Sequence, residues 1–297
     1  MTLKVTKRDG TQQDLDLEKI HGHTEYATRG VEGVSQAELE SDSCMQFYDG
    51  MPTTQIQKTL ELTAADKICL ESPGWSKVAM RLALQDLFKE VTGDSFKYPT
   101  IRSYLKKGVK IGVLDKRLMK DFDLEAIDKA IQPERDELFE YLGLTTLSDR
   151  YFIRDKKGQL GRKNRCLELP QHFFMRVAMG LALAEKPEER TKWAIEFYDV
   201  LSNLEYMSST PTLFNAGTNF AQLSSCFLLS MGDSLKGIFA SLEEAASYSK
   251  FAGGIGIDLG HIRAQGSYIK STQGIAGGAI PYAKLVNDIL LGFDQGG

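Results

Sequence analysis

Long apolar runs are missing from this 297-residue sequence. No run approaches the roughly 18 residues that a membrane-spanning helix needs, and residues 1–8 are too polar for a signal peptide. An excess of basic residues is missing too, because 36 Lys and Arg face 40 Asp and Glu, for a net charge of −4. That balance gives the whole chain no electrostatic footprint for DNA or RNA. We therefore expect a cytoplasmic protein with neither membrane contacts nor direct nucleic-acid contacts.

Cysteine is also scarce, and the sequence contains no metal-binding pattern. The four cysteines are Cys44, Cys69, Cys166 and Cys226. They form no Cys-x-x-Cys pair and match no zinc spacing, and the four histidines show no ligand spacing with acidic residues or cysteine. HEXXH, P-loop and nucleophile-elbow motifs are absent as well. We expect no bound metal ion, and we expect Cys44 and Cys69 to be buried thiols that act as small hydrophobic residues.

The first 207 residues predict a small α+β unit followed by a mainly helical region. Residues 3–7 and 13–15 alternate around an Asp-Gly turn, which is typical of a β-hairpin. Helical patterns follow over residues 17–29, 35–47, 53–70 and 76–92. Residues 93–207 favour helix, apart from a polar, hairpin-like insert at 151–165.

The pattern changes after about residue 218. Two short apolar runs, 223–230 and 254–259, flank a helical pattern over 234–251. This order predicts a parallel βαβ unit whose strands are buried on both faces. Another helix is expected over 281–293. Two parallel strands do not make a stable core by themselves, so we expect further strands to complete the sheet.

Small polar and glycine-rich motifs surround the two expected strands. Taken alone, each has a plain structural interpretation. Cys226 would be a buried strand thiol, loop hydroxyls would form turns, and Asp233 or Ser234 would cap a helix. Gly253-Gly254-Ile255-Gly256 does not match the dinucleotide-binding GxGxxG pattern.

Together, however, the motifs have a recognisable order and spacing. They are STPTLFNAG at 209–217, SSCFLL at 224–229, GDSL at 232–235, GGIGI at 253–257 and HIRA at 261–264. This arrangement resembles the large (α) subunit of class I ribonucleotide reductase. The resemblance implies a mixed α and β fold of three parts: an ATP-cone (1–91), a helical domain (92–217) and the first part of a ten-stranded α/β barrel (218–297) that is incomplete in this chain.

The resemblance assigns catalytic and substrate-binding roles to four residues. Cys226 is one of two cysteines that reduce the ribonucleotide and become a disulfide in each turnover, a two-electron step. Thr210, Ser225 and Gly254 line the substrate site with it, and glycine at position 254 leaves room for a ligand against the backbone. No other cysteine of this chain stands in a context that matches the second redox cysteine.

The resemblance also assigns two effector sites, at which ATP, dATP and other dNTPs act as ligands. The specificity site takes Asp233 for a ribose hydroxyl and Arg263 for phosphates, and helix-start amides can hold phosphate as well. Its other expected residues are Ser234, Leu235, Lys250, Ile269, Lys270, Asp294 and Gln295. The ATP-cone site is expected to consist of Lys7, Arg8, Gln13, Lys19, Thr53, Gln57 and Lys89. Gln13 and Gln57 replace residues more usual in the family, so we expect weak inhibition by dATP.

In complete family members the radical-carrying cysteine and its neighbours lie beyond the position of Gly297. We therefore expect this chain to be an N-terminal portion that is inactive alone: either it works with a complementary C-terminal α polypeptide, or it is a fragment of a longer chain. The expected partners are a radical-generating β subunit that holds the radical cofactor, a second α subunit, and thioredoxin or glutaredoxin as reductant; no covalently bound cofactor is expected. A non-catalytic nucleotide sensor is an alternative, although Thr210 and Ser225-Cys226 argue against it. An anaerobic glycyl-radical reductase is another.

Overall fold

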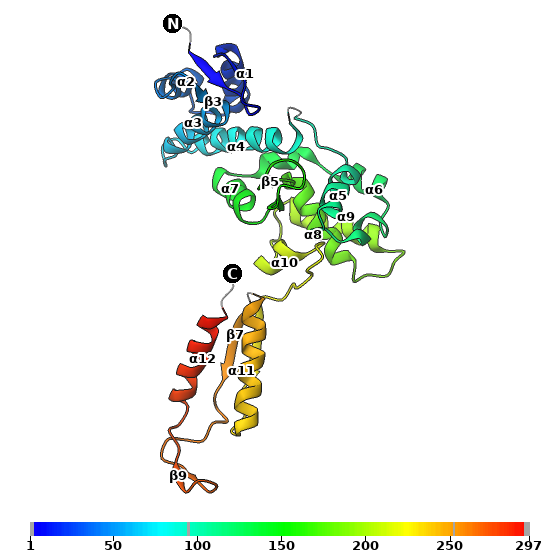
Figure 1. Cartoon of the computed structure of the whole chain (residues 1–297). Helices are drawn as coiled ribbons and strands as arrows, with labels where there is room; N and C mark the ends of the chain where they lie inside the picture. The colour runs from blue at the N-terminus through cyan, green and yellow to red at the C-terminus, as the bar shows by residue number, and fades with distance from the viewer. Residues whose placement is uncertain (1–2, 94–95, 252, 294–297) are drawn as a thin grey trace. The chain divides into compact units, whose positions relative to one another are not determined.

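The computed structural model describes residues 3–93, 96–251 and 253–293. The chain divides into two compact units (Figure 1). Unit 1 comprises Met1–Met207 with Gly217–Asn219, and unit 2 comprises Ser208–Ala216 with Phe220–Gly297.

Residues 3–92 of unit 1 form a three-stranded sheet with four helices. Strand β1 (Lys4–Thr6) pairs antiparallel with β2 (Gln12–Asp14) and parallel with β3 (Met51–Pro52). The helices are α1 (Leu17–Thr28), α2 (Gln36–Cys44), α3 (Thr53–Asp66) and α4 (Gly74–Thr92). The expected hairpin and its four following helices are thus confirmed. Their apolar faces meet in one core around Val5, Leu60 and Val78.

The rest of unit 1 is mainly helical, as expected. It contains α5 (Ile101–Lys110), η1 (Lys116–Met119), α6 (Leu124–Ala130), η2 (Pro133–Leu138), α7 (Tyr141–Arg150), α8 (Pro170–Ala182) and α9 (Arg190–Ser202). The polar insert forms a short antiparallel pair, β4 (Arg154–Asp155) with β5 (Arg165–Cys166). Helix α8 lies at the centre of this region, and eleven of its 13 residues are buried.

A charged network stabilises this core. Arg176 on α8 pairs with Glu168 at 2.6 Å, and both side chains are fully buried. Glu168 also accepts hydrogen bonds from the Tyr104 hydroxyl and from the backbone N–H of Ile153. Because each buried charge has several partners, the pair can remain ionised away from water.

Unit 2 contains the expected βαβ element. Strands β6 (Cys226–Ser230) and β7 (Gly254–Asp258) are parallel and joined by α11 (Leu235–Lys250). The other elements are α10 (Thr210–Asn215), β8 (Tyr268–Ile269), β9 (Gly274–Ile275) and α12 (Ile280–Gly292). A small core around Met231, Ile238 and Leu242 joins α11 to α12.

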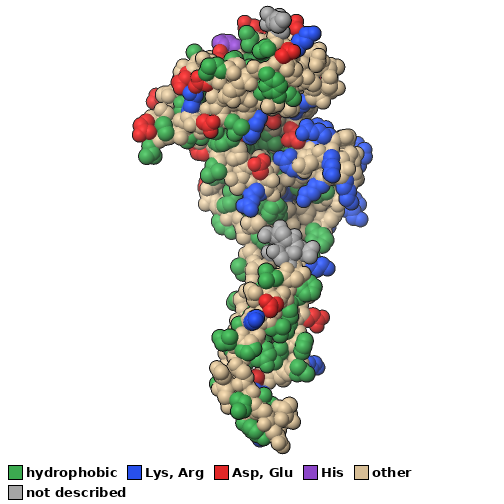
Figure 2. All heavy atoms as spheres, turned by 60° about the vertical axis from the view of Figure 1, so that its left-hand side comes forward, with side chains coloured by type: hydrophobic (Ala, Val, Ile, Leu, Met, Phe, Trp, Pro, Cys, Tyr) green, Lys and Arg blue, Asp and Glu red, His purple; other side chains and the backbone are tan. Residues whose placement is uncertain are grey.

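The expectation that both faces of these strands are buried is wrong for the described residues. Alternate residues of β6 and β7 are exposed, and Leu228 on β6 is 88% exposed. Apolar side chains of unit 2 also show on the surface in Figure 2. The physical reason is that α11 and α12 pack on one side of the strands, and no described element covers the other side.

The expectation of two buried packing thiols is also wrong. Cys69 is exposed because it lies in the turn between α3 and α4, where it bridges to Ser72. Cys44 is only half-buried, although burial still raises the pKa of its thiol. All four cysteines are free thiols.

Candidate functional site

Unit 1 contains a cavity of about 580 Å³ between the hairpin and helices α1, α3 and α4. All seven residues expected for the ATP-cone site line it: Lys7, Arg8, Gln13, Lys19, Thr53, Gln57 and Lys89. They come from five parts of the chain, namely the β1–β2 turn, β2, α1, α3 and α4, so only folding brings them together. The volume falls within the range of small-molecule sites, about 300–1,000 Å³.

The cavity has an apolar floor and a basic rim. Val5, Leu15, Ile20, Ile56 and Leu60 supply the floor. The rim carries the cationic side chains named above, together with two carboxylates that are engaged locally: Asp16 caps α1, and Asp9 accepts from Thr11. An apolar surface suits a nucleobase, and a basic rim suits phosphates.

Two residues of the cavity have their orientation set by α4. Arg8 donates from Nη2 to Asp86 Oδ1 at 2.5 Å, which holds the guanidinium at the rim. Gln57 donates from Nε2 to the Leu82 carbonyl at 2.9 Å. That bond leaves the Gln57 amide oxygen for a ligand, and an oxygen acceptor suits an amino or hydroxyl group better than a phosphate.

The start of α3 adds a second feature that suits an anion. Its N-cap is Pro52, which makes no side-chain cap hydrogen bond, and Thr53 at the first position lines the cavity. The first-turn amides of a helix lack intrahelical partners, so they can donate to an anionic ligand. Sequence reasoning missed Asp86, although it lies one helical turn before Lys89 on the same face of α4.

In unit 2 the structure brings together three of the four expected substrate-site residues. Cys226 opens β6 and is exposed. Its thiol lies 3.6 Å from the Ser225 hydroxyl, and Gly254 is its partner across the parallel pair. The Gly254 N–H donates to the Ser225 carbonyl at 2.7 Å.

Gly254 keeps the space beside the thiol open. A Cβ at this position would lie 3.3 Å from the Ser225 carbonyl oxygen and 3.9 Å from Cys226 Sγ. Any larger side chain would therefore occupy the volume next to the sulfur. Cys166 differs from Cys226, because it is fully buried, and burial raises the pKa of its thiol to about 12 and makes it unreactive.

The fourth residue, Thr210, opens α10. This helix is tied to the segment that leads into β6 by two hydrogen bonds. Thr212 Oγ1 donates to the Leu223 carbonyl at 3.2 Å, and Asn215 Nδ2 donates to the Gln222 carbonyl at 2.7 Å. The helix that begins at Thr210 is therefore held to Leu223, three residues before Cys226.

The expected specificity site is only partly assembled. Arg263 donates from Nε to Asp233 Oδ2 at 2.7 Å, and both side chains are about one-third exposed. Ser234, rather than Asp233, caps α11, by accepting from the Gly237 N–H at 3.0 Å. The Asp233 carboxylate is therefore not used as the helix cap, and Arg263 holds it instead.

The remaining expected residues of this site are dispersed. Leu235 starts α11 and is 75% exposed. Lys250 ends the same helix, about 22 Å further along its axis, so the structure does not bring it near the Asp233–Arg263 pair. Ile269 lies in β8, and Lys270 follows it. Asp294 and Gln295 fall outside the described residues.

Among residues 3–93, 96–251 and 253–293, no group of His, Cys, Asp and Glu side chains is arranged to hold a metal ion. Over the same residues, every helix is too short or too polar to cross a bilayer.

Comparison with known families divides the chain into three matched regions. Residues 3–90 match the ATP cone domain, residues 137–221 the ribonucleotide reductase all-alpha domain, and residues 224–297 the ribonucleotide reductase barrel domain. The first region contains every residue that lines the cavity of unit 1 except Gly93. The third contains Cys226, Gly254 and Arg263.

Curated relatives align with nearly the whole chain. The ribonucleoside-diphosphate reductase subunit alpha of Helicobacter pylori is 45% identical over 293 residues, which is 99% of this chain and 36% of that protein. The corresponding proteins of Chlamydia pneumoniae and Escherichia coli K12 are 36% and 33% identical and are covered over 28% and 38% of their lengths. The chain thus spans between about a quarter and two-fifths of these relatives.

Proposed function

The chain belongs to the ribonucleotide reductase large-subunit family, and we propose that it supplies the allosteric part and the first catalytic part of a ribonucleoside-diphosphate reductase in the cytoplasm. The observation that carries this proposal is the exposed Cys226 thiol, which faces an open space kept by Gly254 and lies beside the Ser225 hydroxyl.

Cys226 is proposed to be one of two thiols that reduce the ribose. The substrate loses a C–OH bond and gains a C–H bond, its hydroxyl leaves as water, and the two thiols become one disulfide, so two electrons are transferred. The second thiol comes from the rest of the barrel, because Cys166 is buried in unit 1 and the other two cysteines belong to the cone. Thioredoxin or glutaredoxin then reduces the disulfide.

The uncovered faces of unit 2 support a need for more protein. Leu228 is 88% exposed on β6, and Ile280 is 79% exposed at the start of α12. Large apolar surfaces of this kind mark interfaces. We assign the strand face to the remaining strands of the barrel, carried by a complementary C-terminal α polypeptide. We assign the groove of about 920 Å³ between α11 and α12 to a second α subunit.

The two nucleotide sites are proposed to regulate this chemistry. The cavity of unit 1 binds ATP or dATP, with the base on the apolar floor and the phosphates at the basic rim. Asp233 and Arg263 bind a dNTP effector, for which one guanidinium nitrogen, Nη1, is still available beside the ion pair. The radical that starts the reaction is supplied by a β subunit.

The decisive experiment is Cys226→Ser in the reconstituted enzyme, with the rest of the α barrel, the β subunit and a dithiol reductant present. We expect multiple turnover to be lost while ATP and dNTP binding persist, because the variant cannot form the disulfide. Cys69→Ser is the matched control, since it removes another exposed thiol and should leave turnover unchanged. Normal multiple turnover by Cys226→Ser would refute the assignment.

A nucleotide sensor without catalysis is the second candidate, because the cavity of unit 1 is complete within this chain. The two candidates are separated by mixing the chain with the remaining part of the α barrel. A stable complex with dithiol-dependent turnover supports the reductase. A chain that binds ATP but forms no complex with the other polypeptide supports the sensor.

A further inference from the structure

Basic residues are concentrated in two segments of unit 1. Residues 97–120 contain eight Lys and Arg, and residues 150–165 contain seven, out of 36 in the chain. Each segment contains only one of the 40 acidic residues. The overall charge of −4 therefore conceals an excess of thirteen positive charges within these two segments, of which Arg154 is paired with Glu90 of α4.

Helix α5 presents part of this charge as a line. Arg102, Lys106 and Lys110 are all exposed, and they recur every fourth residue on one face. Successive members are about 6 Å apart along the helix. Within the described residues, no carboxylate pairs with any of the three. Like charges at this spacing destabilise a helix, so the line does not serve the stability of α5.

The two acidic residues in these segments do not neutralise the line. Asp115 caps η1 and is held by Arg117, at 2.9 Å from Nε and 2.7 Å from Nη2. Asp155 is 1% exposed and accepts the backbone N–H of Leu160 at 2.6 Å. Both carboxylates are therefore used inside their own turns.

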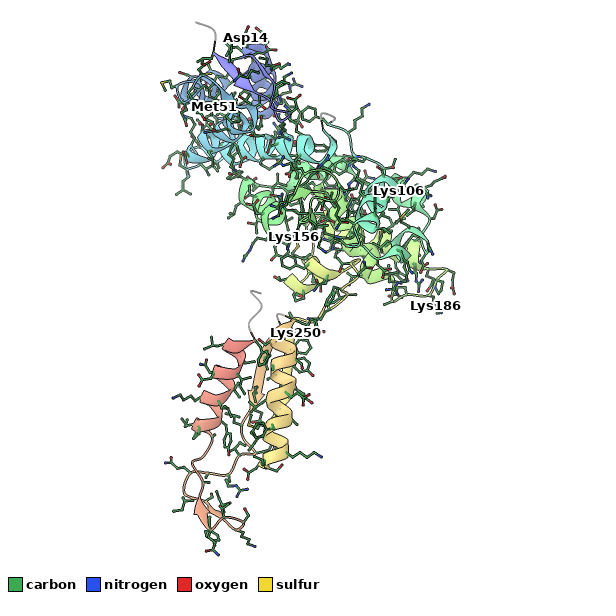
Figure 3. The ribbon with its side chains drawn as sticks, viewed as in Figure 1. Asp14, Met51, Lys106, Lys156, Lys186 and Lys250 are labelled. Atoms are coloured by element: carbon green, nitrogen blue, oxygen red, sulfur yellow. The ribbon has the colours of Figure 1, made fainter. Side chains whose placement is uncertain are left out.

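The β4–β5 insert extends the positive region next to α5. Lys107 on α5 and Leu160 and Arg165 of the insert line one small cavity of about 200 Å³. Arg162 and Lys163, which follow Leu160 closely, are exposed. Figure 2 shows Lys and Arg gathered over the helical part of unit 1, and Figure 3 labels Lys106 on α5 and Lys156 in the insert. The basic surface is defined here as Arg102, Lys106, Lys107, Lys110, Arg162 and Lys163.

We propose that the basic surface binds a short acidic segment of a partner protein, containing several closely spaced Asp or Glu residues. An extended peptide repeats its side-chain direction about every 6.8 Å, which is close to the spacing of about 6 Å along the α5 line. Alternate carboxylates of such a segment can therefore meet successive cations of the helix.

The surroundings favour a short peptide over nucleic acid. Residues 1–90, in the same compact unit, carry ten basic and fifteen acidic residues. A long polyanion would extend from the basic surface into this negative region and be repelled by it. A short peptide would stay on the basic surface, because charges more than about 8 Å away are largely screened at physiological salt. In the described residues of the two basic segments, no aromatic side chain is exposed for base stacking.

The test uses the full chain and a fluorescein-labelled octapeptide of alternating Glu and Asp, followed by fluorescence anisotropy. The variant Arg102→Glu, Lys106→Glu, Lys110→Glu should weaken binding by about tenfold or more, because three attractions become repulsions. The control Lys129→Glu, Lys186→Glu, Lys192→Glu changes the net charge equally at exposed sites elsewhere in unit 1. It should stay within about twofold of the parent. Replacing the same three α5 residues by Gln provides a second variant if charge reversal disturbs folding, which circular dichroism reports.

Three outcomes would overturn the proposal. The peptide fails to bind, the two Glu variants lose affinity equally, or a 20-base-pair DNA duplex binds more tightly than the peptide and loses affinity in the α5 variant. The last result would assign the surface to nucleic acid.

Discussion

Helices α8 and α12 both contain 13 residues, yet eleven residues of α8 are buried and none of α12 is. Composition does not explain the difference, because α12 reads IPYAKLVNDILLG and is rich in Ile, Leu and Val. The difference lies in their neighbours. Helix α8 packs against α7, α9 and η2, whereas α12 packs chiefly against α11. Burial therefore depends on how many elements surround a helix.

The same contrast separates the two candidate sites. The cavity of unit 1 has its floor, its rim and its supporting ion pair within residues 5–93. The Cys226 region has one wall, and the opposite side of its strands is uncovered in the described residues. The proposed function therefore places nucleotide binding within unit 1 alone and assigns the uncovered strand face of unit 2 to further protein.

The largest expected effect comes from the buried ion pair of unit 1. Arg176→Met should lower the free energy of unfolding by about 3–5 kcal/mol, because it leaves the fully buried Glu168 charge without its cation. Urea unfolding followed by tryptophan fluorescence measures this change specifically, since Trp75 and Trp193 both lie in unit 1.

Two controls sharpen this prediction. The double variant Glu168→Leu, Arg176→Met removes both charges and should be more stable than Arg176→Met alone. In unit 2, Asp233→Asn removes the partner of Arg263 in a pair that is about one-third exposed. This change should cost only about 0–1 kcal/mol of unfolding free energy, measured by circular dichroism. Equal losses in the two units would contradict the contrast between them.

The buried core of unit 1 should also respond to pH in two opposing ways. Burial lowers the pKa of His172 to about 4, so stability falls as the pH drops from about 6.5 to about 4, where only the unfolded chain gains the proton. Burial raises the pKa of Asp136 to about 7, so stability falls as the pH rises from about 4 to about 7. The effects amount at most to about 3 kcal/mol for His172 and about 4 kcal/mol for Asp136.

Single variants should separate these effects. His172→Phe retains only the Asp136 contribution, so it should be more stable at about pH 5 than at about pH 7. Asp136→Asn retains only the His172 contribution and should show the reverse order. Urea midpoints at the two pH values measure both slopes. Slopes of the same sign in the two variants would show that these groups do not govern the pH dependence.

The nucleotide sites should be separable by binding. Lys7→Ala with Arg8→Ala should weaken ATP binding to the cavity by about ten- to a hundredfold, the effect of losing about 1.5–3 kcal/mol of charged hydrogen bonding. Asp233→Ala with Arg263→Ala should weaken dTTP binding on the same scale and leave ATP binding unchanged. Calorimetric titration of the assembled enzyme measures both. Loss of the same site in both variants would disprove the two-site proposal.

The smallest expected effect concerns dATP. Gln13 and Gln57 line the cavity with neutral amides in place of the residues more usual in the family, and Gln57 already donates one Nε2 hydrogen to the Leu82 carbonyl. We expect dATP to inhibit the assembled enzyme weakly. Strong inhibition at micromolar dATP would show that glutamine at positions 13 and 57 is compatible with tight control.

Local patterns were sufficient to predict most elements of the chain. Alternation around Asp9-Gly10 predicted the β1–β2 hairpin, where Gly10 adopts a φ of +87°. The strand, helix and strand between residues 223 and 259 were also predicted, because periodicity and turn residues act within a few positions of each other. Motif order alone led to the family that the comparisons support.

Contacts between distant residues were decided by the tertiary structure. The sequence alone could not show that Asp86 holds Arg8, or that the two basic segments meet at Lys107 and Arg165. The exposure of Cys69 and of the β6 strand face was likewise decided by what packs beside them. Periodicity identifies which face of an element is apolar, but only the assembled neighbours determine whether that face is covered.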